Sequence, residues 1–163
     1  MIDLPPGTRE KVYGPAYVSE RLDIEGHVAA PRSFALAELL PRPRTERRIA
    51  GILCGSGKVK TGPQLLSGVL LRDLVDEVSI PFPEHELPNR TWLRATGRDG
   101  YSASFSWHEV WNGPVGEGLI VALERDGQPL DEREGRLCLV STADYRPGPR
   151  RVRYLCRVEV LRL

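Results

Sequence analysis

The sequence has little of the material from which zinc sites and disulfide frameworks are built. Only three of its 163 residues are cysteines and three are histidines. The cysteines are Cys54, Cys138 and Cys156, and the histidines are His27, His85 and His108. They form no CxxC pair and are scattered along the chain, which argues against a zinc framework. A chain that is 40% hydrophobic can build a core without disulfides.

Targeting signals and long apolar runs are also absent. Residues 1–6 have neither a basic start nor an apolar stretch, so no signal peptide is expected. No segment approaches the roughly 20 apolar residues of a membrane helix. We therefore expect a cytoplasmic location and no membrane partner. The net charge of +1 argues against a general nucleic-acid binder.

The length allows one domain with a real core. Residues 1–20 are rich in Pro and Gly and predict an N-terminal arm, followed by a domain over residues 21–163. The strands we expect are 22–25, 46–53, 91–95, 101–105, 119–125, 137–140 and 152–163. Short helices are expected at 37–40, at 70–78 and after Ser106, where Glu109 completes a capping box. The fold class is therefore α+β, a β-rich mixed single domain.

The last expected strand alternates between two faces. Val152, Tyr154, Cys156, Val158 and Val160 fall on one face, and Arg151, Arg153 and Arg157 on the other. This pattern predicts that Cys156 is a core residue, as Cys138 is in the preceding strand.

Cys54 lies where an expected strand ends and a glycine-rich loop, GSGK, begins. Its thiol is either a small apolar group packed at a strand end or a group that can reach solvent or a cofactor. The loop is not a phosphate loop, because Ile52 and Val59 stand where that motif needs Gly and Ser or Thr. The dinucleotide fingerprint fails at Lys60. The loop is then either a flexible surface segment or an anion-binding turn.

The C-terminal segment is basic. Between residues 146 and 163 there are six arginines and one acid. This cluster is either a solvated strand face with a basic turn, or a group of guanidinium forks aimed at a phosphate or oxyanion.

The order of several segments resembles the molybdopterin-binding oxidoreductase domain of the sulfite oxidase family. The segments are 22–31 (LDIEGHVAAP), 34–40 (FALAELL), the strand ending in Cys54, 68–74 (GVLLRDL), 99–102 (DGYS), 126–130 (DGQPL) and 152–160 (VRYLCRVEV). The resemblance covers residues 22–160 and implies the fold of that domain.

The resemblance also implies a function. Cys54 would be the only protein ligand of the molybdenum in a molybdopterin cofactor, because a soft thiolate suits this metal, and Cys54 would be the catalytic residue. The other implied cofactor-binding residues are Ser56, Lys58, Gly148, Arg150, Arg151 and Arg153. The implied reaction is oxo transfer on a small anionic or oxo-acceptor substrate, with electrons passed to an unidentified partner.

The sequence departs from the family pattern around both parts of this site. GSGK follows Cys54 where the family has a polar stretch with Asn and often Arg, and Pro149 replaces an aromatic residue in the turn that contacts the pterin. An alternative therefore stays open: a metal-free binding module on the same fold, holding an anionic small molecule or a protein partner.

Overall fold

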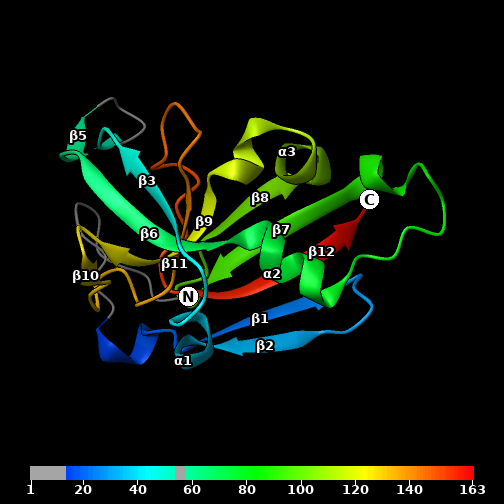
Figure 1. Ribbon diagram of the computed structural model, residues 1–163, viewed down its shortest axis with the longest axis horizontal. Helices are drawn as coiled ribbons and strands as arrows, with labels where there is room; N and C mark the ends of the chain where they lie inside the picture. Colours follow the sequence, from blue (N-terminus) through cyan, green and yellow to red (C-terminus); the bar gives the residue numbers. More distant parts are fainter. Residues whose placement is uncertain (1–13, 54–57) are drawn as a thin grey trace.

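The computed structural model describes residues 14–53 and 58–163, which form two mixed layers of sheet and helix. The first sheet has five strands in the order β2-β1-β12-β7-β8. Their bounds are Arg32–Ala35 (β2), Arg21–Gly26 (β1), Leu155–Arg162 (β12), Thr91–Gly97 (β7) and Ser102–Ser106 (β8). Strand β1 pairs with β12 in parallel and the other neighbours are antiparallel. Figure 1 shows β12 in red between β1 and β7.

The second sheet is antiparallel, with the order β10-β9-β6-β3, and β11 pairs with β9 as well. Its strands are Gln128–Pro129 (β10), Leu119–Arg125 (β9), Gln64–Leu70 (β6), Thr45–Ile49 (β3) and Cys138–Ser141 (β11). A separate hairpin pairs β4 (Ile52–Leu53) with β5 (Val59–Thr61). This hairpin follows β3 directly and brings the chain to residues 54–57, which lie outside the described part.

Three α-helices and three short 3-10 helices connect the strands. The α-helices are α1 (Leu36–Leu39), α2 (Leu71–Val78) and α3 (Trp107–Trp111), and the 3-10 helices span Pro15–Tyr17, Leu87–Arg90 and Pro114–Glu117. Helix α2 buries Leu71, Leu74, Val75 and Val78, as the periodicity predicts. The predicted capping box of α3 is present, with Ser106 and Glu109 bonding each other's backbone N–H groups.

Most of the core lies between the two sheets and α2, and a smaller apolar cluster covers the other face of the second sheet. Residues 119–123 of β9 are therefore all buried, since each of its faces packs against a cluster. Together the sheets and short helices confirm the expected β-rich α+β fold.

Strand β6 was not expected from the sequence. Its residues 64–70 run through the middle of the second sheet, and most of them are buried. A strand buried on both faces loses the alternation that marks a half-exposed strand. Gly68 sits at a register shift against β9, and a β-carbon there would lie 2.1 Å from the carbonyl oxygen of Val121.

The C-terminal strand is shorter than predicted, and its register changes near its start. It begins at Leu155, and the pairing with β7 shifts between Leu155 and Arg157. Leu155 consequently takes a core position while Cys156 is only half-buried, so the prediction of a core cysteine is wrong for Cys156 and confirmed for Cys138. Arg151, expected on the face away from the core, is buried.

The predicted division into an arm and a domain stays a prediction, because residues 1–13 lie outside the described part. Residues 14–20 lie against the domain. The backbone N–H of Ser19 donates to the carbonyl of Gly135, and its side chain donates to the carbonyl of Tyr154 at 2.8 Å.

Candidate functional site

The end of β3 and the connection between β11 and β12 enclose a cavity of about 250 Å³. Its lining consists of residues 48–51, of four residues between 142 and 147, and of Val59 of β5. In Figure 1 the connection between β11 and β12, drawn in orange, rises at the same end of the molecule as β3 and β5. The cavity therefore lies between the two segments in which the sequence predicts functional residues.

Cys54 and Ser56 lie outside the described residues. Their flanks are described: β4 ends at Leu53, and the chain resumes at Lys58, which is exposed. The single strand expected over 46–53 is instead two strands in different sheets, β3 and β4, interrupted at residues 50–51, and the second reaches Leu53. Gly51 and Val59, on either side of this segment in the sequence, both line the cavity.

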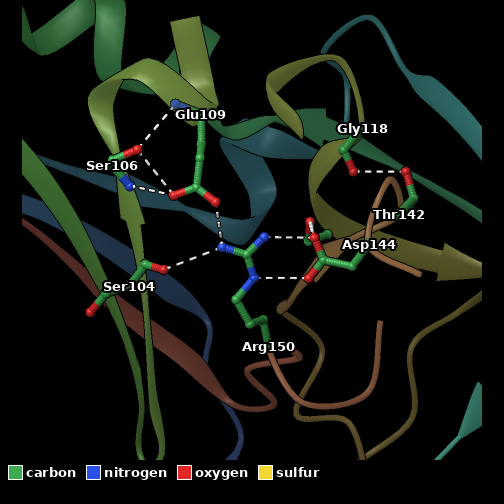
Figure 2. Close-up of polar contacts among 8 residues, drawn as sticks. Ser104, Ser106, Glu109, Gly118, Thr142, Asp144 and Arg150 are labelled. Atoms are coloured by element: carbon green, nitrogen blue, oxygen red, sulfur yellow. Dashed lines mark hydrogen bonds and ion pairs between the residues drawn. The ribbon is translucent and has the colours of Figure 1, made fainter. Parts of the chain in front are cut away.

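Arg150 lies between two carboxylates (Figure 2). Its Nε and one terminal nitrogen donate to both oxygens of Asp144, at 2.8 and 2.6 Å. The other terminal nitrogen donates to Glu109 at 2.9 Å and to the carbonyl of Ser104 at 3.5 Å. The guanidinium carbon also lies 4.3 Å from the centre of the Phe105 ring. The charge of Arg150 is therefore balanced within the protein.

The two carboxylates keep their negative charge. Burial alone would raise the pKa of Asp144, but hydrogen bonds from Arg150 and Ser141 outweigh it and hold the pKa below its usual value. Burial alone would also raise the pKa of Glu109, but the hydrogen bonds from Ser106 and Arg150 outweigh it and lower the pKa. This bridge joins α3 to the connection that walls the cavity, so we call it the Asp144–Arg150–Glu109 bridge.

Because Asp144 and Glu109 have lower pKa values in the folded chain than in the unfolded one, their stabilising effect is present at neutral pH and is lost as pH falls below about 4. We expect Glu109→Gln to lower the free energy of unfolding by about 1 kcal/mol at pH 7. The difference from the wild type should shrink at pH 3.5, which urea unfolding at the two pH values measures. Glu84→Gln, an exposed control, should show no such pH-dependent difference, and a constant difference for Glu109→Gln would contradict the bridge.

Arg151 is buried and faces away from the solvent. It donates to Glu134 at 2.5 Å and, through Nε, to the sulfur of Cys138 at 3.4 Å. Glu134 also accepts from Arg125 at 2.6 Å. Burial raises the pKa of the Cys138 thiol, which is therefore neutral at physiological pH. This cluster is internal, and Arg151 does not line the cavity.

Of the remaining predicted residues, Gly148 accepts a hydrogen bond from the backbone N–H of Arg151 at 3.2 Å. Arg153 is half-buried and makes no side-chain hydrogen bond or ion pair within residues 14–53 and 58–163. The roles predicted for Cys54, Ser56, Lys58, Gly148, Arg150, Arg151 and Arg153 thus stay predictions. The structure brings Arg150 to the cavity wall through Asp144 and leaves Arg151 in the interior.

Arg48 is a basic residue at the cavity that sequence reasoning missed. It lies on β3, lines the cavity, is exposed and has no ion pair with any described residue. The positive charge of the expected strand before Cys54 is the signal that could have identified this residue. Nothing in the sequence distinguishes Arg48 from Arg47, however, whose side chain donates to the carbonyl of Glu117 at 2.8 Å.

A larger and more open cavity, of about 570 Å³, lies elsewhere and contains Cys156. Its charges balance, since three arginines face three acids: Arg21, Arg98 and Arg136 with Glu20, Asp23 and Glu132. Burial also raises the pKa of the Cys156 thiol. None of the predicted site residues lines this cavity, so the smaller cavity is the better candidate.

Within the described residues no group of three or more His, Cys, Asp and Glu side chains is arranged to hold a metal ion. No described helix combines the length and the apolar character needed to cross a membrane.

The fold and the cavity define a β-rich α+β domain with a small pocket between the end of β3 and the connection from β11 to β12. The chain belongs to the family of oxidoreductase molybdopterin-binding domains, whose sequence model matches residues 15–162. No curated protein matches the sequence.

The fold is similar to that in the crystal structure of the sulfane dehydrogenase SoxCD from Paracoccus pantotrophus. The TM-score is 0.68 at 22% sequence identity, and the match covers 86% of this chain. It covers 37% of the SoxCD chain, so this chain spans a little over a third of that relative. This likeness shows the fold.

The described residues fit the family's cofactor in part. Arg48 and Lys58 are exposed cations near the cavity and suit an anionic group. Arg150 and Arg151 are already paired with carboxylates, so they suit such a group less well.

Proposed function

We propose that this domain is a molybdopterin-dependent oxidoreductase in which the thiolate of Cys54 binds the molybdenum. The observation that carries the proposal is that Gly51 and Val59, which flank the Cys54 segment in the sequence, line a cavity with Arg48, an arginine that pairs with no described acid, in a chain of the molybdopterin-binding family. A soft thiolate suits this metal, and a loop position leaves room for substrate. When bound, the cofactor would supply two-electron oxo transfer.

The chain's own residues would bind and orient the anionic groups. Arg48 and Lys58 would contact cofactor or substrate anions, and Arg153 stays a candidate for the same role. Arg150 would act indirectly: by holding Asp144 it fixes the wall of the cavity. Electrons would pass to a separate partner protein. A cytoplasmic location stays a prediction.

The test is the metal and pterin content of the purified chain. The chain is produced in a host that makes the cofactor and, as a control, in a strain that does not. We expect stoichiometric molybdenum together with the fluorescent oxidation product of molybdopterin in the first preparation, and neither in the second. Folded protein from the competent host that holds neither would overturn the proposal and support a metal-free binding module.

A further inference from the structure

The candidate cavity contains an arginine that pairs with no described carboxylate. The lining contains two charged side chains, Arg48 and Asp144. Asp144 shares Arg150 with Glu109, so its charge is held within the Asp144–Arg150–Glu109 bridge, whereas Arg48 has no ion-pair partner among the described residues. A ligand that reaches Arg48 meets a guanidinium with no described carboxylate partner, which favours a negatively charged group.

Exposed apolar side chains also line this cavity. In the described part of the chain five large hydrophobic side chains are exposed, and two of them, Val59 and Tyr145, line this cavity. The side chain of Tyr145 is fully exposed, and Pro147 lies two residues further along the same wall. An exposed aromatic ring at the mouth of a pocket offers a flat surface on which a planar apolar group can stack.

The segment that leads to Tyr145 is held by hydrogen bonds of Thr142 and Asp144. Thr142 bonds the carbonyl of Gly118 through both its backbone N–H, at 2.9 Å, and its hydroxyl, at 2.8 Å. Asp144 is fixed by Arg150 and by the hydroxyl of Ser141, at 2.7 Å. Figure 2 shows the contacts of Thr142 with Gly118 and of Asp144 with Arg150. A wall that is already ordered loses little entropy when a ligand binds.

We propose that this cavity binds a small organic anion that carries a planar apolar group, with the anion at Arg48 and the planar group against Tyr145. The volume of about 250 Å³ is close to the lower limit of small-molecule pockets, about 300 Å³, so the ligand is no larger than one substituted ring. The inference rests on the proposed function in naming this anion as the substrate. Binding itself involves only the chain's own residues and needs no metal.

The test uses three probes on the purified full chain: benzoate, acetate and benzyl alcohol. Ligand-observed NMR titration gives their dissociation constants. Benzoate should bind at least about tenfold more tightly than either other probe, because only benzoate has both the charge and the ring. Arg48→Gln should bring the affinity for benzoate down to that for benzyl alcohol, and Tyr145→Ala should bring it down to that for acetate.

Arg133→Gln is the matched control, because Arg133 is exposed and does not line the cavity. It should bind benzoate as the wild type does. Equal affinities for the three probes, or benzoate binding that survives both cavity substitutions, would overturn the inference. Benzoate binding by a chain that never acquires molybdenum would instead leave this site standing and overturn the proposed oxidoreductase function.

Discussion

Cys54→Ser should abolish molybdenum binding and any molybdenum-dependent turnover while leaving the fold intact. A serine hydroxyl stays protonated at neutral pH and is a hard donor, whereas the cysteine thiolate is a soft ligand that suits this metal. The substitution follows directly after β4 and replaces a sulfur atom with an oxygen atom, so we expect the fold to be kept. Molybdenum content, measured beside the urea unfolding curve, separates loss of the ligand from loss of the fold.

Cys156→Ser is the matched control for this experiment. Cys156 is half-buried, its thiol lies in the other cavity, and burial raises its pKa. We expect this variant to keep its full molybdenum content. A Cys54→Ser protein that retains stoichiometric metal would contradict the proposed ligand, and equal losses in both variants would show a general effect of removing a thiol.

Local patterns predicted the elements that depend on neighbouring residues. Helix α2 follows from the spacing of Leu71, Leu74, Val75 and Val78, and the start of α3 follows from the pair Ser106 and Glu109. Both signals are short-range, because a helix turn and a capping box lie within a few residues of sequence. Strands β7 and β8 lie where strands were expected, at 91–95 and 101–105.

Features that depend on distant residues could not be predicted. Arg150 and Glu109 are 41 residues apart, and no local pattern indicates that they bond to each other. From the sequence, Arg150 was therefore expected to be available to a ligand, whereas in the structure two carboxylates balance its charge. Arg48 is the opposite case: the sequence did not single it out, yet it lines the cavity and pairs with no described acid. Whether an arginine is paired depends on which acids the fold brings near it.

The register shift in β12 explains the remaining differences at the C-terminus. A strict alternation places Cys156 in the core, but the shift between Leu155 and Arg157 gives that position to Leu155. The backbone at Tyr154 has a φ of 55°, a left-handed conformation that an alternating pattern does not reveal. The same departure from a regular strand accompanies the burial of Arg151.

Glu134→Gln should lower the free energy of unfolding by about 3 kcal/mol or more. Glu134 and Arg151 are both buried and lie 2.5 Å apart, so the amide would leave the guanidinium charge without its carboxylate in a site that excludes water. Cys138, the other described partner of Arg151, is a neutral thiol and cannot replace the lost charge. Urea unfolding at pH 7 measures the loss.

Glu132→Gln is the matched control, because Glu132 is exposed two residues away, and we expect a change within about 0.5 kcal/mol. A double variant, Glu134→Leu with Arg151→Met, should recover part of the stability, since removing both charges also removes the cost of burying them. Arg125 would keep Asp131 nearby, at 3.8 Å, in that variant. If Glu134→Gln were no less stable than Glu132→Gln, the buried pair would not hold the segment before β11 against the start of β12. The ion pair with Glu134 would then not explain why the Arg151 side chain lies in the interior, while the neighbouring Arg150 bonds Asp144 of the cavity lining.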